Sequence, residues 1–319
     1  MNNAQNPPLF PVLPPAVAAE RIEIDTPAGR VSYYRAGPPG AFHASHASQF
    51  PPLLLIHSVN AAGSVAEVAP LFEYYRATRH VYALDLPGFG LSSRADRAYT
   101  PRLMTDAVLA LLAVMRAEHG DGDGGSAVDV LGVSLATEFA ARAQREAPHS
   151  IRRVALVSPT GFNGAKRRYG PPGSTLGSLR AYKVFTWPFW ADGIYRNLTR
   201  PGVVRYFLQR TFGAKKIDEA LWRYAVLTAR QPGAKNAPFY FVSAFLFSKD
   251  INTLYEQMDC PVWVSMATRG DFTDYRGRIT VSAKPNWQFH AVEGGALPYF
   301  QDLGAFTAAL DPFLDQQAF

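Results

Sequence analysis

Short uninterrupted apolar runs alternate with amphipathic stretches along most of the chain from Leu53 onward. Such runs are typical of strands buried on both faces, and the stretches between them have the three-to-four-residue spacing of helices. The predicted strands are 53–56, 81–84, 128–131, 154–157, 262–264 and 287–292, and the predicted helices are 65–76, 101–119, 134–146 and 305–317. This alternation predicts an α/β fold, with a mostly parallel central sheet and helices on both faces.

Two further strands are predicted ahead of this pattern. Residues 21–24 and 31–35 have the composition of two short strands joined by a Thr-Pro-Ala-Gly turn, which indicates an antiparallel hairpin. Residues 1–20 form a proline-rich lead, and residues 37–52 show no periodicity. We therefore expect one core domain made of residues 21–159 and 251–319.

Residues 160–250 interrupt the alternation of predicted strands and helices, and they are rich in aromatic and basic residues with helical patterning. We expect them to form a helical cap inserted between two strands of the sheet. The net charge of +6 hides a strong asymmetry, because 15 of the 32 Lys and Arg but only four of the 26 Asp and Glu lie in this segment. This basic, aromatic composition is compatible with peripheral contact with an anionic membrane, which the host fold favours over nucleic acid. The alternative is an ordinary lid with its cations in solvent, and nucleic acid is not expected.

Composition narrows the class of protein further. At 319 residues and 48% hydrophobic content the chain can bury a large core. The single cysteine, Cys260, excludes an internal disulfide framework and a cysteine-based metal cluster. Neither a transmembrane run nor a basic secretory leader is evident, so a cytoplasmic location with peripheral membrane contact is expected. No metal-ligand spacing or nucleotide-binding glycine motif occurs, and we expect neither metal nor cofactor.

The strongest candidate for chemistry is Gly132-Val-Ser134-Leu-Ala136, where a buried strand runs directly into a helix. A serine in so sharp a turn needs small residues two positions away on either side, and the turn aims backbone N–H groups at a developing oxyanion. Ser134 could instead serve only as a helix N-cap. The strand-turn-helix context favours a nucleophile.

With this motif the chain resembles the α/β-hydrolase family, and three other segments carry the same resemblance. His57-Ser-Val59 resembles the family's oxyanion strand, and the loop from Asp85 to Ser93 resembles its Asp-x-Pro-Gly-x-Gly-x-Ser marker, in which the aspartate is structural. Gly270-Asp271 resembles the strand end that carries the triad acid. The resemblance implies Ser134 as nucleophile, Asp271 as acid, and the N–H groups of Val59 and Leu135 as the oxyanion hole.

The family's Gly-His-x-Pro motif is altered here. Gly295-Ala296-Leu-Pro298 stands in its place, so alanine occupies the position of the general base. A serine hydroxyl is a weak nucleophile without an adjacent base. His57 is the first candidate for a substitute, followed by His290 and the carboxylate of Glu293, while Asp274 competes with Asp271 for the role of acid.

The resemblance implies a serine hydrolase acting on a carboxylic ester, including a lipid-like one, through Ser134 and with an atypical base. The alternative is a catalytically impaired protein that keeps the hydrolase shape and binds a small molecule or lipid, or acts as a scaffold. A lyase or a cofactor-independent oxygenase on the same fold ranks third, because those relatives also use the histidine that Ala296 replaces.

Overall fold

A computed structural model describes residues 11–39, 50–119, 127–164 and 166–315. Eight strands form one sheet in the order β1-β2-β4-β3-β5-β6-β7-β8. Their bounds are β1 Glu20–Thr26, β2 Gly29–Ala36, β3 Leu53–Ile56, β4 Val81–Asp85, β5 Val128–Val133, β6 Ile151–Val157, β7 Val262–Ala267 and β8 Trp287–Val292. The first two strands are the expected antiparallel hairpin, and the strands from β3 onward pair in parallel. The predicted mostly parallel α/β sheet is confirmed.

Two buried clusters cover the two faces of the sheet. On one face, α2 (Pro101–His119), α3 (Ala136–Glu146) and α9 (Ile251–Glu256) bury residues such as Leu111 and Phe139. On the other face, α1 (Ala69–Tyr75) and α10 (Leu303–Asp315) bury residues such as Phe72 and Phe306. Because both faces are covered, the strands read as continuous apolar runs in the sequence.

Four helices differ from the sequence-based bounds. The helix expected over 305–317 begins two residues earlier, at Leu303. The helix expected over 65–76 begins as a 3₁₀ turn, Val65–Val68, and becomes α-helical only from Ala69. The helix expected from Ser134 begins at Ala136, because Ser134 has a left-handed backbone. Helix α9 was not expected at all, since its six residues are too few to show helical periodicity.

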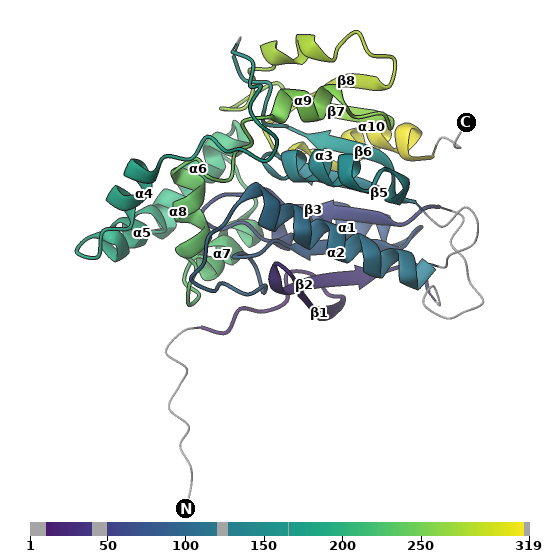
Figure 1. The fold of residues 1–319 in the computed structure, drawn as a ribbon. Helices are drawn as coiled ribbons and strands as arrows, with labels where there is room; N and C mark the ends of the chain where they lie inside the picture. Colours follow the sequence, from purple (N-terminus) through teal and green to yellow (C-terminus); the bar gives the residue numbers. More distant parts are fainter. Residues whose placement is uncertain (1–10, 40–49, 120–126, 165, 316–319) are drawn as a thin grey trace, which may run out of the picture.

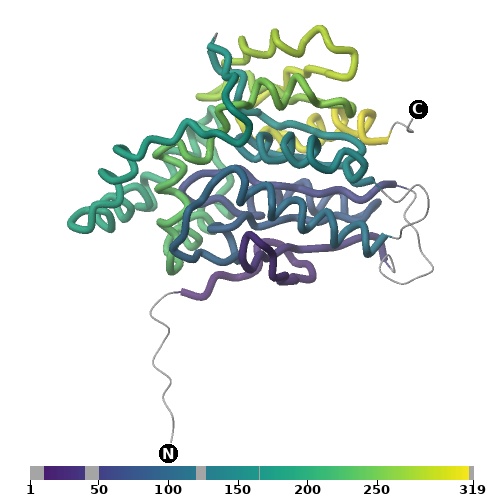
Figure 2. The backbone as a smooth tube through the Cα atoms, viewed as in Figure 1, coloured from purple at the N-terminus to yellow at the C-terminus, as the bar shows by residue number. Residues whose placement is uncertain are grey.

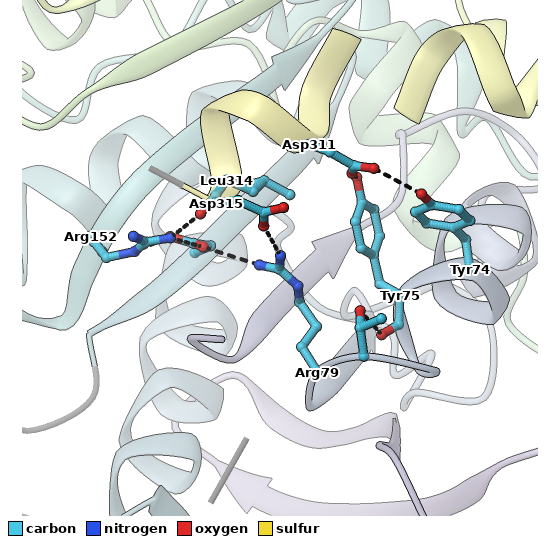
Figure 3. A network of polar contacts seen from close by, with 9 residues as sticks. Tyr74, Tyr75, Arg79, Arg152, Asp311, Leu314 and Asp315 are labelled. Carbon is cyan, nitrogen blue, oxygen red and sulfur yellow. Dashed lines mark hydrogen bonds and ion pairs between the residues drawn. The ribbon is translucent and has the colours of Figure 1, made fainter. Parts of the chain in front are cut away.

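A polar network fastens α10 to the sheet and to α1 (Figure 3). Tyr74 and Tyr75 donate hydrogen bonds from their hydroxyl groups to Asp311, at 2.8 and 2.7 Å. Arg79 binds Asp315, and Arg152 donates both to Asp129 and to the carbonyl of Leu314. The network adds polar contacts to the apolar packing by which Phe306 and Leu310 hold α10 on the sheet.

Five helices lie between β6 and α9: α4 (Leu179–Phe185), α5 (Ala191–Leu198), α6 (Pro201–Phe212), α7 (Glu219–Thr228) and α8 (Asn236–Val242). We call residues 160–250 the insertion. In Figure 1 these helices gather at one end of the strands, and α4 and α5 lie furthest from the sheet. No helix in the described ranges is both long and apolar enough to cross a bilayer.

Helix α3 holds both ends of the insertion. The buried carboxylate of Glu138 accepts a hydrogen bond from Thr160 Oγ1 at 2.7 Å and another from the backbone N–H of Ser248 at 2.6 Å. One turn further along, Arg142 forms a buried ion pair with Asp250 at 2.8 Å. The helix that follows Ser134 therefore fixes where the insertion leaves and re-enters the core.

Candidate active site

Ser134 occupies a strained turn between β5 and α3. Its φ of 54° lies in the left-handed region, which costs a residue with a side chain about 1–2 kcal/mol. The turn is held from both sides, because the N–H of Ser134 donates to Val157 O at 2.8 Å and its carbonyl accepts from Thr137 N at 3.2 Å. A Cβ at Gly132 would lie only 3.2 Å from Ala136 O, which explains the small residue at this position.

Parallel pairing brings the predicted oxyanion-hole residues to the same sheet edge as Ser134. Ile56 at the end of β3 is the partner of Gly132 in β5, so the two strands end next to each other. Val59 and Ser134 follow shortly after these two ends. Within the described part of the chain, the backbone N–H groups of Val59 and Leu135 donate no hydrogen bond to the protein. The absence of a protein partner for these two N–H groups is what the predicted oxyanion hole requires.

His57 has neither ring nitrogen free. Nδ1–H donates to Ser58 O at 2.6 Å, and Nε2 accepts the backbone N–H of Leu86 at 3.0 Å. The ring is fully buried, and this desolvation lowers the pKa of His57 to about 4. This bonding argues against the predicted role of His57 as general base, because a base must offer a free nitrogen to the hydroxyl that it deprotonates. His57 instead joins the ends of β3 and β4.

Glu67 supports the turn after His57, and sequence reasoning missed it. Its Oε2 accepts the backbone N–H of Ser58 at 2.9 Å, and its Oε1 accepts Asn60 Nδ2 at 2.6 Å. Burial raises the pKa of Glu67 to about 7. The glutamate therefore shapes the loop that carries Val59; in the sequence it looks like one solvated residue of an amphipathic stretch.

Asp271 lies on the surface and pairs with the insertion. Its carboxylate accepts two hydrogen bonds from Arg210 in α6, from Nε to Oδ2 at 2.5 Å and from Nη2 to Oδ1 at 3.0 Å. Its side chain is 41% exposed. The competing acid, Asp274, is also engaged, since it accepts the N–H of Gly164 at 2.8 Å and binds the guanidinium of Arg276.

Ala296 is buried against the C-terminal end of α6. Its N–H donates to Thr211 O at 2.7 Å. The preceding Gly295 lies so close to the same helix end that a Cβ would come within 2.2 Å of Thr211 O. The position that resembles the family's histidine is thus a contact between the core and the insertion.

The other sequence candidates lie elsewhere. His290 stacks on Trp263 with ring centroids 5.3 Å apart, and burial lowers its pKa. Glu293 is largely exposed and pairs with Arg269 at 3.2 Å. Two further histidines, His43 and His46 in the stretch 37–52 that lacks periodicity, fall outside the described residues. In the ranges that the structure covers, no hydrogen bond joins the hydroxyl of Ser134 to an imidazole or a carboxylate, and no cluster of His, Cys, Asp or Glu side chains could hold a metal ion.

Comparison with known families decides how this arrangement is classified. The family model described as "Alpha/beta hydrolase family" matches residues 53–309. The chain belongs to the α/β-hydrolase family. The match includes Ser134, Asp271 and the whole insertion. The predicted fold class and family resemblance are thereby confirmed.

Individual relatives of this α/β-hydrolase cover different shares of it. The dihydrolipoyllysine-residue acetyltransferase component of the acetoin cleaving system from Cupriavidus necator is 42% identical over 85 residues, which is 27% of this chain and 21% of that protein. The structure of a carboxylesterase from Bacillus subtilis has a TM-score of 0.64 at 16% identity, covering 94% of this chain and 93% of that one. An enol-lactonase from Burkholderia xenovorans has a TM-score of 0.66 at 16% identity, covering 92% and 100%. At these identities the two structures show the shared fold alone.

The Asp85 loop of this α/β-hydrolase has a structural function. The buried carboxylate accepts the N–H groups of Val65 and Leu91, both at 2.9 Å, and burial raises the pKa of Asp85 to about 6. A Cβ at Gly90 would lie 1.9 Å from that carboxylate, so only glycine fits there. The loop thus fixes the turn after β4 against the 3₁₀ turn that carries Glu67.

Proposed function

We propose that this chain is a serine hydrolase that binds a carboxylic ester, including a lipid-like one, and cleaves it slowly through Ser134. The observation that carries the proposal is the left-handed turn at Ser134, together with two nearby backbone N–H groups that donate to no acceptor among the residues the structure describes. A protein gains no stability from this strained backbone, and such strain is found most often at functional sites. The carboxylesterase and the enol-lactonase of the same fold both carry names that describe ester chemistry.

In the proposed reaction, Ser134 Oγ attacks the ester carbonyl carbon, and the proton of its hydroxyl passes through solvent water to the oxygen of the leaving alcohol. The N–H groups of Val59 and Leu135 hold the oxyanion, and the alcohol leaves as the carbonyl re-forms on an acyl-serine. Water then releases the acid and restores the hydroxyl. Without a base the oxyanion hole alone leaves a residual acceleration of about 10³–10⁴ over water in serine proteases, and the expected turnover is correspondingly low.

A second candidate function is a binding or scaffold protein that has kept the hydrolase shape. Two observations favour it. Asp271 is bound by Arg210 rather than oriented toward an imidazole, and Ala296 is held against the end of α6. These contacts use the acid and base positions to attach the insertion to the core.

Labelling with a fluorophosphonate probe tests the proposal. We would compare the unmodified protein with Ser134→Ala, Ala296→His and the double variant Arg210→Ala/Ala296→His, and confirm by thermal unfolding that each variant is folded. Labelling of the unmodified protein that Ser134→Ala abolishes supports the hydrolase. No labelling without Ala296→His, or none in any variant, overturns it in favour of the binding protein. The double variant frees Asp271 and should label faster than Ala296→His alone.

A further inference from the structure

The insertion exposes a cluster of large apolar side chains at its outer end. The residues involved are Leu179, Val184, Trp187, Phe189 and Trp190, in α4 and the turn that joins it to α5. We call residues 179–190 the tip. Phe189 is 89% exposed and Leu179 67%, and α4 contains no buried residue. Single exposed apolar residues are ordinary, but five within one short segment mark an interaction surface.

The tip is held in this orientation by its other side. Tyr182 packs on Tyr240 of α8, with ring centroids 4.5 Å apart, and on Phe245. The indole N–H of Trp190 donates to Val184 O at 2.7 Å and fixes the turn. These contacts of Tyr182 and Trp190 fix the backbone of the tip, and its exposed apolar side chains are thereby held toward solvent.

The tip is also basic. Arg180 and Lys183 lie exposed on α4, and Arg196 on α5. The sequence contains no Asp or Glu between Glu146 and Asp192, and Asp192 is itself paired with Lys235. Cations beside exposed Trp and Phe are suited to an anionic lipid surface, where the rings enter the interface and each Lys or Arg adds about fivefold in affinity.

We propose that the tip docks this protein on an anionic lipid bilayer. Figures 1 and 2 show α4 and α5 projecting beyond the rest of the insertion, so a flat surface can meet the tip before it meets the sheet. A second copy of the chain fits less well, because a two-fold contact would place Arg180 and Lys183 of each copy against the same cations of the other. The proposal holds whether or not Ser134 cleaves an ester.

Sedimentation with vesicles tests this docking. Extruded vesicles of phosphatidylcholine alone would be compared with vesicles containing 30% phosphatidylglycerol, at low and high salt. We expect binding to the anionic vesicles that weakens with salt, and quenching of tryptophan fluorescence by lipids brominated on their acyl chains. Trp187→Phe/Trp190→Phe should remove that quenching, because the remaining tryptophans lie outside the tip.

Matched substitutions assign the binding to the tip. Phe189→Ser should weaken it about tenfold or more and Lys183→Ser about fivefold. Ile279→Ser, which removes a 64% exposed apolar residue elsewhere, and Arg30→Ser in β2 should change it less than twofold. Lack of binding to anionic vesicles overturns the proposal, as does binding that Phe189→Ser leaves intact. A dimer that Phe189→Ser dissociates, with no lipid binding, would show that the occupant is a second copy.

Discussion

Asp271 and Arg210 form a two-pronged ion pair that joins the loop after β7 to the last turn of α6. In the family resemblance this aspartate orients the catalytic histidine; here the same carboxylate meets a guanidinium from the insertion. The N–H of Ala296 bonds to the same turn of α6, at Thr211 O. Both positions that the resemblance assigns to the acid and the base therefore attach the insertion to the core.

Replacing Ser134 with glycine should stabilise the fold while removing the nucleophile. Glycine adopts φ near +54° without the steric cost borne by serine, so Ser134→Gly should raise the unfolding free energy by about 1 kcal/mol. Ser134→Ala keeps the strain and should leave stability nearly unchanged. Urea unfolding of both variants measures the difference. Equal stability of the two variants would show that the turn stores no strain.

His57 should make the protein sensitive to acid. Its pKa of about 4 in the folded state lies below the ordinary value of about 6.5, so the unfolded state takes up the proton first as the pH falls. The contribution of neutral His57 to the free energy of unfolding is fully present above pH 6.5. It falls by about 3 kcal/mol as the pH drops to 4. His57→Gln keeps a donor and an acceptor but does not titrate. Its deficit relative to the unmodified protein should therefore shrink as the pH falls.

The comparison with His57→Gln is needed because buried acids act in the opposite direction. The raised pKa values of Glu67 and Asp85 favour folding at low pH and withdraw that contribution as the pH rises through about 7 and 6. Urea unfolding of both proteins from pH 4.5 to 7.5 isolates the imidazole. A constant deficit across this range would contradict the assignment.

Arg142→Ala should destabilise the fold severely. The substitution leaves Asp250 buried without its cation, and breaking a buried pair in this way costs about 3–5 kcal/mol. Arg30→Ala removes one partner of a pair whose side chains are 63% and 83% exposed, and should cost less than about 1 kcal/mol. Chemical denaturation of the two variants gives the comparison. Similar costs would mean that Asp250 reaches water in the folded protein.

Gly295→Ala should loosen the contact between the core and α6. The added Cβ would meet Thr211 O at 2.2 Å, so either the helix end or the loop has to move. Hydrogen exchange at the Ala296 amide should become faster, and the melting temperature should fall. Gly193→Ala is the matched control, since nothing lies within 4 Å of its Cβ in α5. It should stabilise the helix by about 0.5–1 kcal/mol.

The sequence was informative where one local pattern determines the structure. The strand over 53–56 was predicted with the bounds that the structure has, because its burial on both faces leaves a continuous apolar run. The strand over 287–292 also has its predicted bounds, although only its two end residues are buried. The turn at Ser134 was recognisable from Gly132 and Ala136 for a steric reason that the backbone bears out. The bounds of α9 and of the 3₁₀ turn at Val65 depend on tertiary contacts and left no periodic signal.

Site residues that act through distant partners could not be found in this way. Nothing in the local sequence distinguishes Glu67 from a solvated acid. Its hydrogen-bond donors, Ser58 and Asn60, come within reach only when the fold places the end of β3 beside it. The pairing of Asp271 with Arg210 spans 61 positions and depends on how α6 meets the core. His57 was a reasonable candidate from its place in the chain, and only the hydrogen bonds to Ser58 and Leu86 show that both nitrogens are occupied.

Glu138 binds Thr160 and Ser248 with one carboxylate, and this makes the insertion a closed loop of about 90 residues whose ends meet at a single side chain. The entropy of closing a loop grows only with the logarithm of its length, by about 0.6 kcal/mol per doubling. The core is therefore nearly indifferent to how long the insertion is, provided that both ends still reach Glu138. The insertion can thus be lengthened, shortened or exchanged in evolution at little thermodynamic cost to the sheet.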